Sequence, residues 1–381
     1  MKFFFFRECM KTLFRCAMLL AMISQTLQAD ATPPPRDLAP TLKPLAEKFN
    51  LPGVVGAIIH GDQIVALGSV GIRKVGDPAP FLSSDLIHLG SDTKALTAIL
   101  IGQIIDRRQL TMDTTMRDIF PEFAASMNPE MAKVTVRDLL NHDAGFPHDL
   151  DWWALDRTHL SLPEQRKRAV KEALAAAPAQ PIGKYFYSNV SFVLLGAIVE
   201  AKTGQSWEEV IRQKIFDPLQ MSSAGFGPPS VDGSIDQPWG HVVNKGKLKP
   251  VQTDNAPVLG PAGRVHCSMS DWCKFVGAII HAAQGHSKLI SAATFEKLIT
   301  PPPGQEYAGG WIVTKRPWAG GRALTHSGSN TTWFCTVWIA PNNDFAVLLA
   351  TNTGAEAVGK AVDNGIGLLI GVNSQLAGNP K

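Results

Sequence analysis

Ser91 and Lys94 are the first residues in this sequence whose types and spacing suggest chemistry. They follow Leu89-Gly90 and open a long apolar run with helical periodicity, and residues three apart lie on one helix face. A serine hydroxyl becomes a good nucleophile when a base removes its proton, and a lysine of lowered pKa can be that base. The backbone N–H of Ser91 could also hold an oxyanion. The alternative is an N-cap serine beside a lysine that extends to solvent.

A second motif, Tyr187-Ser188-Asn189, precedes a helical pattern that begins at Val190. The chain has only three tyrosines, so a tyrosine two positions before an asparagine is unusual by chance. Tyr187 could carry a proton if a cation such as Lys94 lowered its pKa. Asn189 could donate its side-chain amide to a substrate carbonyl. The alternative is an aromatic residue at a helix entry with Asn189 as its N-cap.

A third motif, His326-Ser327-Gly328, lies on a strand-like run that leads into Ser329. A strand that lines a cleft presents backbone N–H and C=O groups to a substrate, and Gly328 permits close approach. His326 would supply a hydrogen-bond donor or a positive charge that faces the pocket. The alternative is a surface histidine at the end of a strand.

Strand-like runs lie near both ends of the chain, and helical patterns lie between them. The sequence therefore predicts an α/β (α+β) fold: an antiparallel sheet flanked by helices from both chain ends, with an inserted, mostly helical lobe. We expect the sheet lobe over about 42–100 and 255–370 and the helical lobe over about 101–254. Strands are expected over 54–60, 63–70, 310–314, 322–326, 332–340 and 345–351, and helices over 44–49, 95–105, 136–140, 163–176, 190–203, 207–216, 271–283, 292–298 and 357–370.

The first residues have the order of a signal peptide: a basic segment, an apolar run over 16–23 and small residues around Ala29. We expect residues 1–29 to be cleaved, whether translation starts at Met1 or Met10, and the protein to be exported to the periplasm or secreted. The apolar run is too short to span a bilayer comfortably. A proline-rich segment predicts a linker over 30–41, and residues 371–381 are expected to form a tail.

Residues 1–29 hold four of the 36 Lys and Arg residues and one of the 33 Asp and Glu residues. The rest of the chain therefore has 32 of each and no formal net charge. This balance gives no electrostatic reason to expect nucleic acid or a membrane surface as a partner. Three cysteines follow the leader, and we expect buried thiols rather than a disulfide framework.

The order and wide spacing of the three motifs resemble those of the serine β-lactamase and penicillin-binding-protein superfamily, in which the S-x-x-K element is typical. Within it, the sequence is most similar to class C β-lactamases, D-alanyl-D-alanine carboxypeptidases and β-lactamase-like esterases. The resemblance covers about residues 42–370. Supporting stretches are Leu51-Pro52-Gly53-Val54, the run from Asp138 to Gly145, Gly309-Gly310-Trp311 and the run from His326 to Pro341.

The resemblance implies a role for each motif residue. Ser91 would be acylated, and Lys94 and Tyr187 would share general acid and base work. Asn189 would contact the acyl-amide side of the substrate, which would be a small molecule or a peptide, and His326 and Gly328 would line the opposite wall. The N–H groups of Ser91 and Ser329 would form the oxyanion hole.

Class C β-lactamases carry Lys where this chain has His326, and histidine at this place resembles the peptidase and esterase branches. An imidazole binds a substrate carboxylate less firmly than an ammonium group does. We therefore expect an esterase or D-amino-acid peptidase rather than an efficient β-lactamase. Trp152-Trp153 and His148-Asp149 are expected to shape the acyl pocket.

Two other functions compete with the hydrolase. One is a binding module that recognises β-lactam-like or peptidoglycan ligands without turnover. The other is a metal enzyme that uses His142, His148 and Asp149 or Asp151, but no H-E-x-x-H pattern supports it. We therefore expect no metal and no cofactor, and the sequence leaves the oligomeric state open.

Overall fold

The computed structural model describes residues 33–355 and 358–378. The chain divides into two units, Met1–Pro35 and Arg36–Lys381, and the second is described here by itself. The expected signal peptide over 1–29 lies outside the described residues and stays a prediction. Among the helices that the structure does describe, none is long and apolar enough to cross a membrane.

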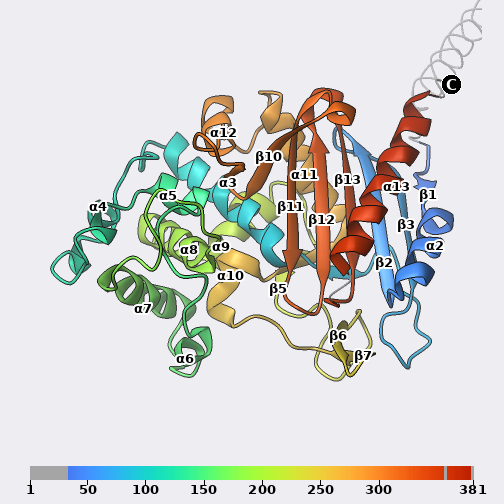
Figure 1. Ribbon diagram of the computed structural model, residues 1–381, viewed down its shortest axis with the longest axis horizontal. Coiled ribbons are helices and arrows are strands. Elements are labelled where there is room, and N and C mark those ends of the chain that lie inside the picture. Colours follow the sequence, from blue (N-terminus) through green and yellow to red (C-terminus); the bar gives the residue numbers. More distant parts are fainter. Residues whose placement is uncertain (1–32, 356–357, 379–381) are drawn as a thin grey trace, which may run out of the picture. The chain divides into compact units, whose positions relative to one another are not determined.

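The largest sheet of the second unit has eight strands, and it combines strands from both ends of the chain (Figure 1). Its order is β1-β3-β2-β13-β12-β11-β10-β9. Every neighbouring pair is antiparallel except β1 and β3. The strands are β1 (Arg36–Asp37), β2 (Gly53–His60), β3 (Gln63–Gly71), β9 (Tyr307–Ala308), β10 (Trp311–Arg316), β11 (Gly321–Ser329), β12 (Phe334–Ala340) and β13 (Phe345–Thr351).

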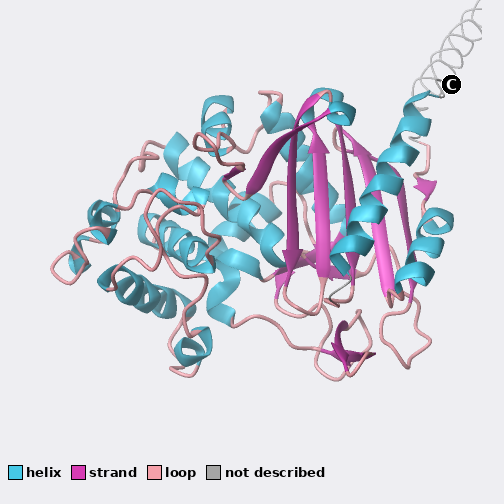
Figure 2. Ribbon diagram, viewed as in Figure 1, coloured by secondary structure: helices cyan, strands magenta, loops and turns pink. Residues whose placement is uncertain are grey.

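Helices cover both faces of this sheet, which explains why β13 is buried along its whole length. Successive side chains of a strand point to opposite faces. Leu348 therefore packs with the cluster that contains helix α11 (Met269–Ala283), whereas Val347 packs with α2 (Ala39–Phe49) and α13 (Val358–Gly378). Figure 2 shows α13 across one face of the strands. A strand covered on both faces reads as a continuous apolar run, as β13 does.

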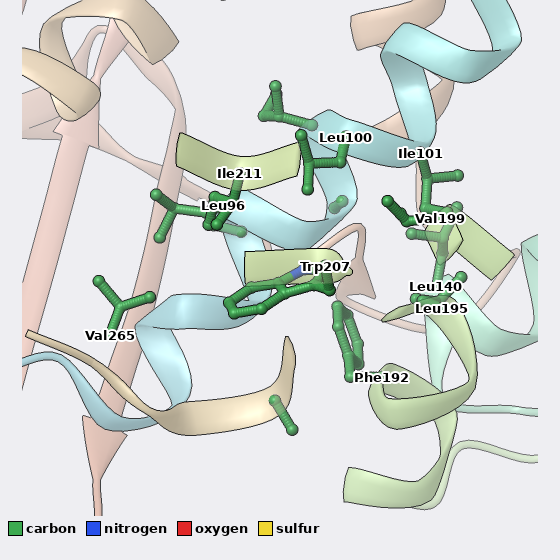
Figure 3. Packing of buried hydrophobic residues seen from close by; sticks show 14 of the residues in the cluster. Leu96, Leu100, Ile101, Leu140, Phe192, Leu195, Val199, Trp207, Ile211 and Val265 are labelled. Carbon is green, nitrogen blue, oxygen red and sulfur yellow. The ribbon is translucent and has the colours of Figure 1, made fainter. Parts of the chain in front are cut away.

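The predicted helical lobe is built around two helices that are buried on nearly every side, α3 (Thr93–Asp106) and α8 (Asn189–Thr203). Figure 3 shows side chains of both helices packed around Trp207. The Trp207 Nε1–H also donates to Thr97 Oγ1 (3.2 Å), which fixes α9 against α3. The remaining helices are α4 (Met116–Ile119), α5 (Val136–Asn141), α6 (Trp152–Asp156), α7 (Leu162–Ala175), α9 (Trp207–Ile211), α10 (Gly260–Gly263) and α12 (Ala292–Leu298).

Two smaller sheets were not expected from the sequence. A three-stranded sheet has the order β4-β8-β5. It lies beside the start of α3, because Leu89 N–H, just before that helix, donates to O of Val265 in β8 (2.9 Å). A two-stranded hairpin pairs β6 with β7. Their bounds are β4 (Leu86–His88), β5 (Gly225–Phe226), β6 (Gly240–Asn244), β7 (Lys247–Val251) and β8 (Val265–Ser268).

Two predicted boundaries differ from the structure. The expected linker over 30–41 contains β1 and the first turn of α2, because Pro40 occupies a helix position where proline is tolerated. Leu38 and Leu42 are fully buried, so this segment belongs to the core. At the other end, α13 continues through the expected tail to Gly378.

Candidate active site

Ser91 lies in a single 3-10 turn, Gly90–Asp92, that leads directly into α3. Gly90 has a positive φ of 47° and lies against the end of β11, where an added Cβ would be 2.3 Å from Ser329 N. Only glycine meets both conditions without strain. The start of α3 has no side-chain cap, so the alternative role of Ser91 as an N-cap does not apply.

Lys94 is fully buried, and its ammonium group makes three hydrogen bonds. Nζ donates to Ser91 Oγ (3.1 Å), to Asn189 Oδ1 (2.8 Å) and to Ala262 O (2.8 Å). Burial lowers the pKa of Lys94 to about 7, and the charges of Asp149 and Asp92 oppose this shift. An amine with this pKa exchanges its proton near neutral pH, as a general base must.

Tyr187 immediately precedes the N-cap of α8, and its ring lies over Lys94 with the ring centroid 4.8 Å from Nζ. Burial raises the pKa of Tyr187 above its ordinary value, although a hydrogen bond with Ser91 opposes the rise. The condition set from the sequence, that a cation lowers the Tyr187 pKa, is therefore not met, because burial is the largest influence on it. Tyr187 faces the nucleophile as a protonated phenol, able to donate rather than to remove a proton.

Asn189 is the first residue of α8 and not its cap, since Ser188 Oγ accepts from Ser191 N–H (3.4 Å). The side-chain oxygen of Asn189 accepts from Lys94, and its Nδ2 donates to Asp149 Oδ1 (2.9 Å). The amide expected to meet substrate is thus already bonded on both sides, although Nδ2 keeps a second hydrogen.

The side chain of His326 does not face the substrate side of β11, which corrects the expectation from the sequence. It is buried, its Nδ1 lies 2.9 Å from Asp92 Oδ1, and its Nε2 lies 3.2 Å from the Tyr307 hydroxyl. The reason is the alternation of side chains along a strand. His326 and Gly328 face the 3-10 turn Gly90–Asp92, here called the nucleophile turn, whereas Ser327 is exposed on the other face.

Gly328 lets the backbone of β11 lie directly on the nucleophile turn. A Cβ at this position would be 1.9 Å from Leu89 O, a distance that no side chain could accept. The end of β11 is therefore held beside Ser91, with Ser329 next to Gly90. This arrangement brings together the two backbone segments expected to form the oxyanion hole.

Asp254 connects the nucleophile turn with the residues at the end of β11 through side-chain contacts. None of the motifs singled out from the sequence includes it. Gly90 N–H donates to His88 Nδ1 (3.0 Å), and His88 Nε2 lies 3.0 Å from Asp254 Oδ1. Asn330 Nδ2 donates to the same oxygen (2.9 Å), and Arg264 Nε donates to Oδ2 (3.1 Å). No local pattern could have revealed this network, because its members come from four distant segments.

A pocket of about 330 Å³ opens over the nucleophile, and Ser91, Tyr187, Asn189 and Ser329 all line it together with His148. A second pocket of about 280 Å³ adjoins it and shares Asp149, Asn189 and Asn255 with it, and Trp152 and Trp153 line its far part. Among the described residues, no Lys or Arg lines either pocket. The four residues expected to shape an acyl pocket therefore lie in this continuous cleft.

The alternative metal site receives no support from the described residues, where no group of three His, Cys, Asp or Glu side chains could hold a metal ion. His142 is buried, and its Nδ1 accepts from Ser188 N–H (3.2 Å). Burial lowers the pKa of His142 well below its ordinary value. The three cysteines of the described chain, Cys267, Cys273 and Cys335, are buried free thiols, as predicted.

Comparison with known proteins finds relatives that match along most of this chain. An unguisins hydrolase of Aspergillus campestris is 26% identical over 87% of this chain, and this chain spans 64% of that protein's length. Penicillin-binding protein 4 of Amycolatopsis lactamdurans is 26% identical over 81% of this chain and 83% of its own length.

A solved class C β-lactamase from Rhodobacter sphaeroides has the same fold, with a TM-score of 0.69 and 19% identity over 88% of this chain and 98% of its own. The sequence profile of the family described as Beta-lactamase matches residues 38–371. That span includes every strand of the large sheet except β1, the inserted helices and all three motifs. The chain therefore belongs to the Beta-lactamase family.

Proposed function

We propose that this chain is a serine hydrolase that forms an acyl-enzyme on Ser91 and cleaves an ester, an amide or a β-lactam. The observation that carries the proposal is the buried Lys94 amine, 3.1 Å from Ser91 Oγ and with a pKa of about 7. Near neutral pH a large share of this amine is neutral, so its lone pair can accept the serine proton. The hydrolase and the penicillin-binding protein among its relatives support the same reaction class.

In the first step, Ser91 Oγ attacks the substrate carbonyl and Lys94 takes the hydroxyl proton. The backbone N–H groups of Ser91 and Ser329 stabilise the negative oxygen, because they belong to two segments in direct backbone contact. Removing one such donor costs on the order of 3 kcal/mol of transition-state stabilisation in serine hydrolases. Tyr187, a protonated phenol, then donates to the leaving group and recovers its proton from Lys94.

In the second step, water attacks the acyl carbon and the bond to Ser91 Oγ breaks. Lys94, neutral again after the first step, accepts a proton from the water through Tyr187 or directly. That proton returns to Ser91 Oγ as the acid leaves.

The cleft favours an ester or a D-amino-acid peptide over efficient turnover of β-lactams. β-Lactam antibiotics carry a carboxylate beside the reactive amide, and a cation in the wall would bind it. Among the described residues no Lys or Arg lines the cleft, and His326 is bonded to Asp92 and Tyr307. A carboxylate would therefore find no strong partner there.

A substrate panel tests the proposal: short p-nitrophenyl esters, nitrocefin and D-Ala-D-Ala peptides, each assayed with the wild-type protein and with Ser91→Ala. We expect turnover of at least one class by the wild type, none by Ser91→Ala, and a loss of several orders of magnitude in Lys94→Ala. Intact-mass spectrometry should show one acyl group on the wild type. Hydrolysis that persists in Ser91→Ala would refute the acyl-enzyme.

The same panel separates the binding module without turnover. Such a protein would release one product per molecule in a burst, keep the acyl group on Ser91 and stop. The hydrogen bond of Lys94 with Ser91 and the position of Tyr187 over Lys94 in the same pocket favour turnover, because both proton-carrying groups needed for the second step are present.

A further inference from the structure

A continuous chain of hydrogen bonds runs from the nucleophile to the edge of the cleft. Lys94 Nζ donates to Ser91 Oγ (3.1 Å) and to Asn189 Oδ1 (2.8 Å). Asn189 Nδ2 donates to Asp149 Oδ1 (2.9 Å), and the ring of His148 bonds to Asp149 Oδ2 (2.5 Å). We propose that Asp149 is a positioning residue that orients the Asn189 amide and sets the charge state of Lys94. This inference rests on the proposed function, in which Lys94 is the base.

Asp149 decides which way the Asn189 amide faces. An amide has one accepting and one donating end, whereas a carboxylate only accepts. The NH₂ end of Asn189 must therefore face Asp149, and the oxygen must face Lys94. If the amide were reversed, its NH₂ group would meet the Lys94 amine, and a donor would face a donor.

Asp149 is itself held in place, although its side chain is 39% exposed. Trp152 Nε1–H donates to Asp149 Oδ1 (2.7 Å), and His148 bonds to the other oxygen. The backbone joins the same two segments, since Asn189 N–H donates to His148 O (2.8 Å). The carboxylate is thus fixed relative to α8, and this allows it to orient a side chain of that helix.

The charge of Asp149 also acts on Lys94, where it partly offsets the burial that lowers the lysine pKa. Other titratable groups lie around Lys94 or its neighbour Asp92, and burial keeps one of them, the Cys335 thiol that bonds to Asp92, protonated. Asp92 raises the lysine pKa, Tyr187 is held as a neutral phenol, and burial keeps His142 largely neutral. His326 bonds to Asp92 on the far side. Asp149 is therefore one of two carboxylates that keep Lys94 basic enough to take a proton from Ser91.

The test is Asp149→Asn, a substitution that removes the charge and keeps the hydrogen bonds. Its oxygen can still accept from Asn189 and Trp152, and its NH₂ can donate to a neutral His148 ring. The matched control is Asp151→Asn, two residues along the same segment. Asp151 is 70% exposed and caps α6 by accepting from Ala154 N–H (2.9 Å), a role that Asn fills equally well.

The readout is the Lys94 titration, followed by NMR in protein labelled with [ε-¹³C]lysine and assigned by the resonance lost in Lys94→Gln. We expect the midpoint to fall by roughly 0.5–1 pH unit in Asp149→Asn and to stay in place in Asp151→Asn. The midpoint of the acid limb in the pH profile of kcat/KM should fall by the same amount. An unchanged midpoint in Asp149→Asn, or equal shifts in both variants, would overturn the charge effect.

Asp149→Ala tests orientation, because it frees the amide of Asn189 as well as removing the charge. At the pH optimum we expect its kcat to be roughly tenfold or more below that of Asp149→Asn. Equal kcat values in the two variants would overturn the orienting role. Failure of the proposed function looks different: no Ser91-dependent turnover with any substrate, while the NMR midpoints still decide whether Asp149 and Lys94 are coupled.

Discussion

Lys94 shows how a residue type that is normally exposed becomes useful when it is buried. Its amine has no access to solvent, and its three partners are a hydroxyl, an amide oxygen and a backbone carbonyl. None of these partners carries a full charge, so desolvation dominates and the pKa falls to about 7. The two carboxylates farther away prevent a deeper fall.

The pH dependence of the reaction follows from this pKa. Lys94 must be neutral to act as a base, so kcat/KM should rise with pH through a midpoint near 7. Because the pKa of Tyr187 is raised, its phenol stays protonated and the rate should hold a plateau to roughly pH 9.5. A profile with an ester substrate, corrected with Ser91→Ala, measures both limbs. A midpoint near the ordinary lysine value would contradict a lowered Lys94 pKa, and a midpoint well below 7 would mean that another group is the base.

Tyr187→Phe should slow turnover by roughly 100-fold or more at pH 8, because the phenol that donates toward Ser91 is lost while its ring still fills the site. Tyr185→Phe is the matched control, since Tyr185 lies two residues away, is 41% exposed and does not line the nucleophile pocket. Steady-state rates with the best ester compare the two. Near-wild-type rates in Tyr187→Phe would remove this residue from the mechanism.

For individual residues, the sequence predicted which residue types form the site better than it predicted where their side chains point. Ser91, Lys94 and Tyr187 converge because their motifs lie at element boundaries that local patterns reveal. The direction of His326 depends on strand parity, which is set by the pairing of β11 with β12. The role of Asp254 depends on three partners, His88, Arg264 and Asn330, from separate segments, so no sequence window contains it.

Among the elements, β11 and the nucleophile turn form the contact on which the site depends. Gly328 of the strand and Gly90 of the turn allow backbone to meet backbone. Asp254 joins the two segments through His88 and Asn330. Such contacts position N–H groups more firmly than side chains do, because they have no rotamers to select.

Gly328→Ala should lower kcat by at least roughly 100-fold, because the new methyl group would push β11 away from Leu89 O and displace the oxyanion donors. Gly359→Ala is the control: it lies on α13, where an added Cβ meets nothing within 4 Å. That change should leave kcat unaltered and raise stability by up to about 1 kcal/mol. Turnover assays and thermal unfolding compare the two variants, and an active Gly328→Ala would contradict the close contact.

Long elements were predictable and short ones were not. The run over 345–351 matches β13 because β-branched and apolar residues fill it and a Pro-Asn-Asn turn precedes it. Strands β4, β5 and β8 have two to four residues each, and their only signal is their mutual pairing. The expected helix over 207–216 is an α-helix only to Ile211 and continues as a π-helix, a change with no clear sequence signal.

In the second unit, the active site and the packing of α2 and α13 lie on opposite faces of the eight-stranded sheet. One face of the sheet packs on the large cluster that includes α3 and α8, and the other packs on α2 and α13. Changes under α2 should therefore affect the free energy of unfolding without affecting the reaction.

Leu42→Ala tests this separation, since Leu42 is fully buried under α2. We expect the free energy of unfolding to fall by about 2–4 kcal/mol, while kcat below the unfolding transition stays within roughly twofold of wild type. Lys43→Ala, on the exposed side of the same helix, should change neither quantity appreciably. Urea denaturation and ester turnover measure the two effects, and a parallel loss of kcat in Leu42→Ala would show that the faces are coupled.

Because β2 pairs with β13, the central part of the sheet can form only after the last strand of the chain has been synthesised. Thr351 Oγ1 donates to Gly53 O (2.7 Å) across 298 positions of sequence. Strand β11 is synthesised only shortly before β13. While the polypeptide is being synthesised, Ser91 and Lys94 are made early, but β11, which lies opposite them in the folded protein, is still missing. Catalytic competence must therefore switch on at the end of folding, so ribosome-stalled or truncated chains that stop before β11 should be inert, and folding should be slow for a chain of this size.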